Sequence, residues 1–213
     1  MFYLSSDQVF DGKDLVHHER DHVSPTTTVG KTKLAAEYFI EKNNLNYVIL
    51  RCCSTYGCSI NPLQQTWLEV MENNFSKRKI SYLDDCLVQG YLDPVYVARI
   101  IKLCIDSNIK NRLLQVTSKD FMTRFEFGSL YCKYFDGSLE LIKKKNWPYP
   151  ELEKRSESFE KLYFKMNGEN AEDSFDVFMP TIEESLSLTL QKWGEQKNKN
   201  KKRAQKNTGL SYI

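Results

Sequence analysis

The stretch "VGKTKLAAEYFIEKNNLNYVILRCC", residues 29–53, sets a segment of helical periodicity directly before a continuous apolar run. The apolar residues with helical spacing, which predict a helix over residues 30–43, are Leu34, Ala35, Tyr38 and Phe39. The run "YVILRCC" (47–53) is short and apolar apart from Arg51, which is the pattern of a strand buried on both faces. A helix followed by such a strand is typical of a parallel sheet covered by helices.

The segments on both sides repeat this alternation, which predicts an α/β fold that ends in a mixed lobe. Strands are predicted at residues 2–6, 79–83, 112–118 and 139–142. Helices are predicted at residues 63–75 and 94–106, after a capping box at Thr123 and Glu126, and from Thr181 to Trp193. The segment 143–172 is predicted to be irregular because it is highly charged.

The composition suits one folded domain with a small appended lobe. Of the 213 residues, 41% are hydrophobic and 13% aromatic, which is enough for a core. No apolar run approaches the roughly 18 residues of a membrane helix, and the start "MFYLSSDQ" lacks the basic region of a signal peptide. The six cysteines form no C-x-x-C pair, so we expect reduced thiols in a cytoplasmic protein rather than a disulfide framework.

Charge is distributed unevenly along the chain. Residues 195–213 carry six basic residues and one acidic residue, which gives them a net charge of +5. Because the whole chain has a net charge of +2, residues 1–194 have a net charge of −3. We expect this basic tail to be disordered and to end a domain that spans residues 1–194. A basic tail can contact nucleic acid or anionic lipid, but a solubilising end without a partner is the preferred interpretation.

The triplet Gly30-Lys31-Thr32 resembles the end of a phosphate-binding loop. That loop needs a glycine five residues before the triplet, so that backbone N–H groups can surround the phosphates. Pro25 occupies this position and has no N–H group. The triplet therefore indicates the start of a helix rather than a nucleotide-hydrolase loop.

The segment His18-Glu19-Arg20-Asp21-His22 matches the H-E-x-x-H pattern of zinc proteases. That chemistry requires both histidines on one face of a helix. Ser24-Pro25 follows directly and disfavours a helix, so we predict a solvated charged loop and no metal site.

Three segments together carry a resemblance to a known family. They are "YLSSDQVFDG" (3–12), "VGKTKLAAE" (29–37) and "ILRCCSTYG" (49–57), with the acidic loop "HHERDHVSP" (17–25) between the first two. Their order resembles the extended short-chain dehydrogenase/reductase superfamily. It is most similar to the branch of dTDP-4-dehydrorhamnose reductase and of the methionine adenosyltransferase β subunit. The resemblance implies part of a Rossmann-like parallel sheet with a small α+β substrate lobe.

The resemblance also implies roles for individual residues, in a reaction that reduces a 4-keto sugar nucleotide with NADP or NAD. Ser6 and Lys33 take the catalytic positions, and Val29 takes the position of the tyrosine that donates a proton. The positions that contact the cofactor are those of Ser5, Lys33, Cys52 and Cys53. The positions that contact the substrate are those of Gln8, Val9, Phe10 and Ser54.

Two departures from the family pattern bear on activity. Valine has no proton to donate, and the loss of a general acid costs about 10² to 10⁴ in rate. Tyr38 and Tyr56 are poor substitutes, because one lies two turns into the helix and the other beyond the strand. None of the nine glycines forms G-x-G-x-x-G or G-x-x-G-x-x-G, so we expect no pyrophosphate cradle in this chain.

By this resemblance Met1 stands just before the fifth strand of the usual sheet, which would leave one edge of the remaining sheet uncovered. We therefore expect a truncated, impaired sugar-nucleotide reductase that requires a separate glycine-rich half. The alternatives are a non-catalytic regulatory subunit of another enzyme and a decayed gene fragment. Neither a membrane nor a nucleic acid is an expected partner.

Overall fold

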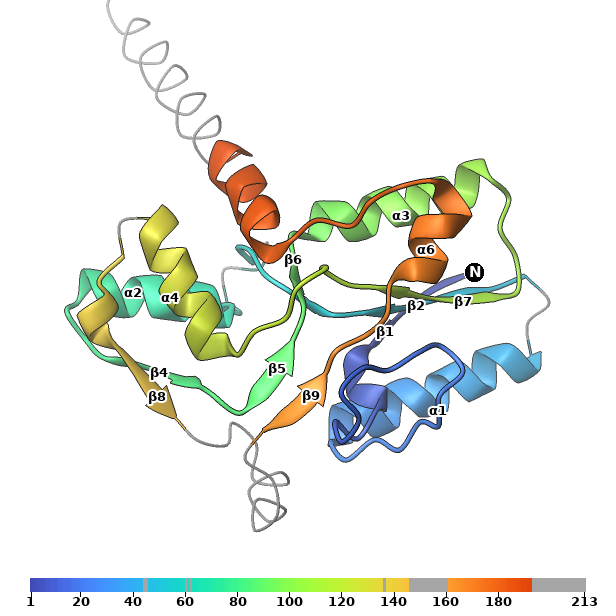
Figure 1. The fold of residues 1–213 in the computed structure, drawn as a ribbon, viewed down its shortest axis with the longest axis horizontal. Helices are drawn as coiled ribbons and strands as arrows, with labels where there is room; N and C mark the ends of the chain where they lie inside the picture. The colour runs from blue at the N-terminus through green and yellow to red at the C-terminus, as the bar shows by residue number, and fades with distance from the viewer. Residues whose placement is uncertain (44–45, 60, 62, 136, 146–160, 193–213) are drawn as a thin grey trace, which may run out of the picture.

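The main sheet has three parallel strands in the order β1-β2-β7 (Figure 1). The computed structural model describes residues 1–43, 46–59, 61, 63–135, 137–145 and 161–192. The strands are β1 (Phe2–Ser6), β2 (Val48–Cys52) and β7 (Arg112–Val116). Leu4 lies in register with Leu50, and Leu50 with Leu114. The predicted α/β fold with a parallel sheet is confirmed.

Helices cover both faces of this sheet. Helix α1 (Thr28–Asn43) lies on one face, and α3 (Pro94–Asp106) and α6 (Glu169–Phe175) lie on the other (Figure 1). Helix α3 begins as predicted at a proline, and the Asp93 side chain accepts a hydrogen bond from the Val95 N–H at 2.9 Å. Apolar side chains of α3 and of β2 share one core cluster, so burial on this face fixes the helix on the sheet.

The lobe is a second packed unit with its own core. It contains α2 (Trp67–Ser76), α4 (Arg124–Tyr134) and the parallel pair of β4 (Ser81–Asp84) with β8 (Ile142–Lys145). Phe127 is at its centre, with its ring 4.5 Å from that of Tyr91 and 4.9 Å from that of Tyr56. The predicted capping box is present, since Glu126 N–H donates to Thr123 Oγ1 and Thr123 N–H donates to Glu126 Oε2.

Two short parallel pairs lie between the sheet and the lobe. Strand β3 (Ser54–Thr55) pairs with β6 (Tyr91–Leu92), and β5 (Leu87–Gln89) pairs with β9 (Leu162–Phe164). Sequence analysis missed β3, β5 and β6, because strands of two or three residues are too short to show a period. The helix predicted at 63–75 begins only at Trp67, after a capping box from Thr66 to Glu69 that was overlooked.

The strand predicted at 139–142 was wrong, as was part of the irregular segment at 143–172. Residues Leu139–Leu141 form a 3-10 turn, η2, and the strand is the charged run that follows, β8. Residues 162–164 form β9 and residues 169–175 form α6, whereas residues 146–160 lie outside the described residues. The sequence predicted irregular structure for Lys143–Lys145, but these residues form an exposed strand because β4 supplies the pairing partner.

The last described helix, residues 182–192, forms buried hydrogen bonds with Tyr56 and Asp93. Tyr56 Oη donates to Ser185 Oγ at 2.7 Å, and Thr189 Oγ1 and Lys192 Nζ donate to Asp93 Oδ2 at 2.7 and 2.8 Å. The basic tail predicted at 195–213 lies outside the described residues. None of the described helices combines the length and apolar character required to cross a membrane. All six cysteines are free thiols.

Candidate functional site

The carboxyl ends of β1, β2 and β7 lie together at the edge of the sheet that faces the lobe (Figure 1). Ser6 ends β1 and is in register with Cys52, which ends β2. Cys52 is in turn in register with Val116, the last residue of β7. Open parallel sheets bind ligands outside these strand ends, so the fold itself places the predicted residues at a suitable location.

The Ser6 hydroxyl is held by two partners from the turn that follows. Ser6 Oγ lies 2.8 Å from Asp7 Oδ1, and it accepts a hydrogen bond from the Gln8 N–H at 3.2 Å. Ser6 thereby caps the 3-10 turn η1 (Asp7–Val9). Half-buried at the end of the strand, this hydroxyl can polarise an oxygen atom of a ligand.

Asp7 is a candidate site residue that sequence analysis did not name. Its side chain is 3% exposed, and its Oδ2 has no hydrogen-bond partner among the described residues. Burial raises the pKa of Asp7 from 3.8 to about 7, although hydrogen bonds from Ser6 and Gln8 act in the opposite direction. The signal that could have revealed it is an acidic residue directly after a buried strand and next to the predicted hydroxyl.

Helix α1 approaches this turn so closely that only glycine fits at the contact. A Cβ atom on Gly30 would lie 2.0 Å from the Gln8 carbonyl oxygen and 2.9 Å from Pro25 Cβ. Thr27 Oγ1 accepts a hydrogen bond from the Gly30 N–H at 3.0 Å and donates to Gln8 Oε1 at 2.9 Å. The glycine of the Gly-Lys-Thr triplet thus serves helix packing, and Gln8 is bound to the start of α1.

Val29 and Lys33 lie one helical turn apart on α1. The Val29 side chain is 51% exposed at the start of the helix. Lys33 Nζ donates to the Leu4 carbonyl oxygen at 2.7 Å and lies 5.2 Å from the centre of the Tyr3 ring. Lys33 therefore contacts β1, the strand that Ser6 ends, and a site shared by Lys33 and Ser6 stays a prediction.

The other predicted cofactor positions are largely buried. Cys52, Cys53 and Ser5 are less than a tenth exposed, and Ser5 Oγ has no partner among the described residues. Burial, followed by the nearby Asp7 carboxyl, raises the pKa of Cys52 to about 12 and raises that of Cys53 further. Both thiols are therefore neutral, and their assignment to cofactor binding stays a prediction.

The predicted substrate positions differ in their access to solvent. Gln8 and Ser54 are partly exposed, whereas Val9 and Phe10 are fully buried. The Phe10 ring stacks on His17 at 4.2 Å and lies 5.2 Å from the Arg51 guanidinium. Contact of Val9 and Phe10 with a substrate stays a prediction, and in this structure both residues belong to the core.

Neither candidate replacement for the missing tyrosine reaches this site. Tyr38 is exposed on α1, two turns beyond Val29, and Tyr56 is buried with its hydroxyl bonded to Ser185. That both are poor substitutes stays a prediction.

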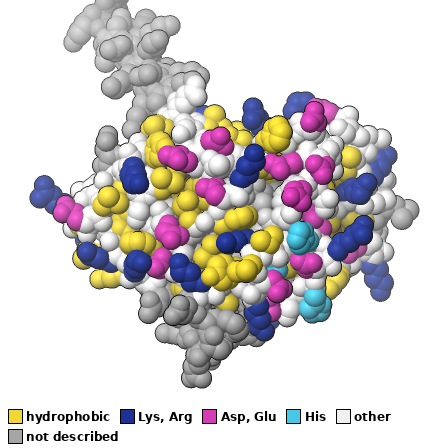
Figure 2. Space-filling view, viewed as in Figure 1, with side chains coloured by type: hydrophobic (Ala, Val, Ile, Leu, Met, Phe, Trp, Pro, Cys, Tyr) yellow, Lys and Arg dark blue, Asp and Glu magenta, His cyan; other side chains and the backbone are white. Residues whose placement is uncertain are grey.

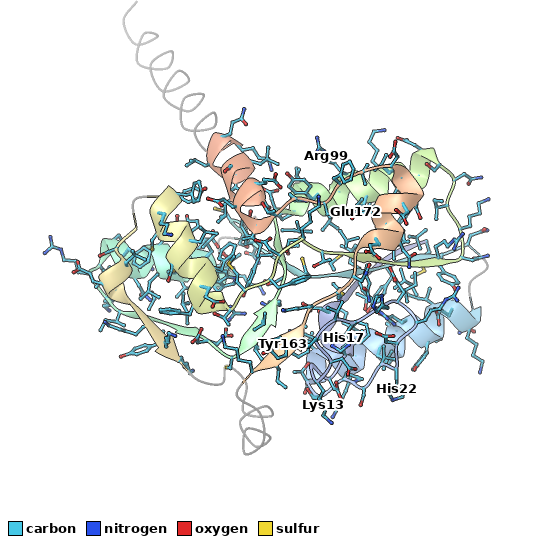
Figure 3. The ribbon with its side chains drawn as sticks, viewed as in Figure 1. Lys13, His17, His22, Arg99, Tyr163 and Glu172 are labelled. Carbon is cyan, nitrogen blue, oxygen red and sulfur yellow. The ribbon has the colours of Figure 1, made fainter. Side chains whose placement is uncertain are left out.

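The H-E-x-x-H segment is not helical. His18 and His22 are exposed in a loop in which the His18 N–H donates to Asp21 Oδ2, and His22 lies apart from His17 (Figure 3). His17 instead pairs with the Tyr163 carbonyl oxygen at 3.0 Å (Figure 3). Among the described residues, no group of three or more His, Cys, Asp or Glu side chains is arranged to hold a metal ion. The absence of a metal site stays a prediction.

Known proteins share this fold over most of the chain. A dTDP-4-dehydrorhamnose reductase from Bacillus anthracis, in complex with NADP, superimposes with a TM-score of 0.73 at 18% identity over 87% of this chain and 63% of its own. A second such reductase, from Clostridium acetobutylicum, gives 0.69 at 20% identity over 88% and 65%. A dTDP-glucose 4,6-dehydratase from Bacillus anthracis, in complex with NAD, gives 0.71 at 17% identity over 92% and 62%. These identities establish the fold alone.

Curated sequences similar to this chain carry a different name. Methionine adenosyltransferase 2 subunit beta from Rattus norvegicus is 28% identical over 144 residues, and the protein of that name from Danio rerio is 25% identical over 135. The match covers 64% of this chain and 42% of the rat protein, so the chain corresponds to less than half of that relative. The model of the family described as "RmlD substrate binding domain" matches residues 1–194. The chain therefore belongs to the RmlD substrate binding domain family, within the extended short-chain dehydrogenase/reductase superfamily.

Proposed function

We propose that this chain is a member of the sugar-nucleotide reductase group that retains the substrate-polarising hydroxyl and the lysine but has lost the proton donor. The substrate class is a dTDP-linked 4-keto sugar, held between the strand ends and the lobe. Residues 1–194 form the domain that would hold the substrate, and a cytoplasmic location accords with six free thiols.

One observation supports this proposal: a half-exposed valine stands one turn before Lys33, at the position that the resemblance assigns to the family's tyrosine. Carbonyl reduction requires a proton for the developing alkoxide, and a positioned side chain normally supplies it. Ser6 can polarise the carbonyl, and Lys33 can stabilise a phenolate or contact a ribose. The valine side chain has no proton to donate to the alkoxide, so we expect reductase activity to be low or absent.

Replacing Val29 by tyrosine should restore the proton donor. We expect NADPH oxidation with dTDP-4-dehydrorhamnose to be faster by about 10² or more when this hydroxyl is present. The assay uses chimeras in which a relative's glycine-rich half is joined to this chain, and it compares Val29 with Val29→Tyr.

Val29→Phe is the matched control, because it adds the ring without the hydroxyl. Val29→Phe should remain as slow as Val29. Equal rates for all three folded, cofactor-bound chimeras would show that residue 29 is not the proton-donor position.

The residues present do not fit a complete dinucleotide. Lys33 could contact a ribose, but it is already bonded to the Leu4 carbonyl, and the other predicted positions are buried. The sequence contains no glycine-rich turn for a pyrophosphate, so we derive no catalytic step through a cofactor held by this chain alone.

Consequently, the isolated chain should bind neither NADP nor NAD tightly. Calorimetric titration of the purified protein with each cofactor should give dissociation constants weaker than about 1 μM, which corresponds to about −8 kcal/mol. Tighter binding of either cofactor would mean that the described residues form a cradle that the glycine pattern does not reveal.

A second candidate function is that of a non-catalytic subunit, and two observations favour it. The curated relatives are named as the beta subunit of methionine adenosyltransferase 2. Moreover, β1 is an edge strand whose Phe2 and Leu4 side chains are 37% and 45% exposed. An apolar edge of this kind pairs readily with another chain, such as a glycine-rich segment or another enzyme subunit.

The two functions are separated by a binding and turnover experiment. A regulatory subunit should form a stable complex with a methionine adenosyltransferase catalytic chain and should show no NADPH oxidation. A chain from the reductase group should show NADPH oxidation once a glycine-rich half and the Val29→Tyr change are supplied, and it should form no such complex. Acidic and basic side chains are interspersed on the face shown in Figure 2. Because nucleic acid binds to clustered basic side chains, we do not propose it as a partner.

A further inference from the structure

The hydroxyl of Ser6 has one hydrogen and two lone pairs to distribute among its neighbours. The Gln8 N–H occupies one lone pair at 3.2 Å. The remaining lone pair and the hydrogen are shared between Asp7 Oδ1, at 2.8 Å, and whatever ligand reaches the site. What Ser6 offers a ligand therefore depends on which of the two groups donates in the contact with Asp7.

The protonation state of Asp7 decides that direction. An ionised carboxylate can only accept, so it takes the Ser6 hydrogen and leaves a ligand with a lone pair. A protonated carboxyl must place its hydrogen, and Oδ2 has no hydrogen-bond partner among the described residues. The proton then belongs on Oδ1, donated to Ser6 Oγ, and the Ser6 hydrogen is free to point at a ligand.

The groups around Asp7 allow its carboxyl to gain or lose a proton near neutral pH. The titratable groups that interact with it are the thiols of Cys52 and Cys53, which stay protonated because burial and Asp7 raise their pKa values. The Lys33 ammonium acts on Cys52 and is bonded to the Leu4 carbonyl oxygen. Beyond the turn, Arg51 lies against Phe10 and is paired with Glu37, and His17 stacks on the same ring. Burial raises the pKa of Asp7 to about 7.

We infer that Asp7 is a positioning residue that switches Ser6 between donating to a keto oxygen and accepting from an alcohol. This inference rests on the proposed function, since it takes Ser6 to face the sugar position that is ketone in one ligand and alcohol in the other. Protonated Asp7 favours the keto ligand, and ionised Asp7 favours the hydroxy ligand. Asp7 acts only through Ser6 and transfers no proton to the ligand.

The two ligands should therefore respond to pH in opposite directions. With a midpoint near 7, the protonated fraction of Asp7 falls about tenfold between about pH 6 and pH 8, so the apparent affinity for the ketone should fall up to about tenfold. The affinity for the alcohol should rise by a similar factor. The full chain is titrated by NMR with dTDP-4-dehydrorhamnose and, separately, with the corresponding 4-hydroxy sugar nucleotide.

The carboxyl carbon signal of Asp7, followed in the same samples, gives its midpoint directly. Asp7→Asn should make the affinities for both ligands independent of pH, and Ser6→Ala should do so while Asp7 still titrates. Crossed pH dependences in the wild-type chain, with the Asp7 midpoint, support the inference. Binding of both ligands with parallel or flat pH profiles overturns it and leaves the proposed function standing. Failure of both ligands to bind at any pH refutes the proposed function and this inference with it.

Discussion

Replacing Glu37 by leucine should lower the free energy of unfolding by about 3 to 5 kcal/mol, because it leaves a charged guanidinium buried without its partner. Glu37 on α1 and Arg51 on β2 have side chains that are 2% and 5% exposed. Arg51 Nη2 donates to Glu37 Oε2 at 2.7 Å and Arg51 Nε donates to Glu37 Oε1 at 3.1 Å, which is the bidentate geometry of a strong pair.

The same guanidinium also holds the loop that precedes α1. Arg51 Nη1 donates to the Glu19 carbonyl oxygen at 3.2 Å, and the Glu19 carboxylate accepts from the Gln115 N–H and from Asn170 Nδ2. An unpaired Arg51 would thus disturb α1, the loop and β7 together. Because α1 carries Val29 and Lys33, this pair also fixes the site relative to the sheet.

Urea unfolding measures the effect, with Glu41→Gln as the matched control one turn further along α1, where the side chain is exposed. The control should change the stability by less than about 0.5 kcal/mol. The double variant Glu37→Leu/Arg51→Met should recover most of the loss, because no buried charge remains. A loss below about 1 kcal/mol in Glu37→Leu would show that water reaches Arg51 in solution.

Sequence patterns could predict the sheet because its central strand shows its burial directly in the sequence. The run at 48–50 is buried on both faces, as continuous apolar strands of parallel sheets are. Helix α1 forms where a helix was predicted, but Tyr38 and Phe39 of the predicted apolar set are exposed, and the buried residues of α1 are Gly30, Glu37 and Ile40. Strand β8 could not be predicted, because the reason that lysines 143–145 are extended is the neighbouring β4. Pairing between distant segments leaves no periodic signal in either of them.

Some residues of the candidate site could be named from the sequence, and others could be found only in the folded structure. Ser6, Val29 and Lys33 were identified through the family resemblance alone, and in the structure α1 contacts both β1 and the turn that follows Ser6. Asp7 and the Glu37–Arg51 pair were missed, because their importance comes from burial and not from the identity of their neighbours in sequence. A carboxylate is ordinary on a surface and consequential when it is buried, and only the folded chain distinguishes the two.

Asp7→Asn should stabilise the protein above neutral pH and leave its stability unchanged in acid. Burial raises the pKa of Asp7 to about 7 in the folded chain, whereas the unfolded value is close to 3.8. A raised carboxyl pKa favours folding fully below the unfolded value, and this contribution is lost as the pH rises through the folded value. Three pKa units correspond to about 4 kcal/mol, lost between about pH 4 and pH 7.

Asparagine keeps the shape and the hydrogen-bonding capacity of the side chain but does not ionise, so the variant should lack this loss. The unfolding free energy of Asp7→Asn minus that of the wild type should rise by up to about 4 kcal/mol from about pH 4 to pH 7 and then level off. Asp85 and Asp93, whose pKa values are lowered, titrate in both proteins and cancel in the difference. A flat difference for Asp7→Asn would mean that its carboxyl is solvated in the folded protein, and the switch proposed for Ser6 would then lose its physical basis.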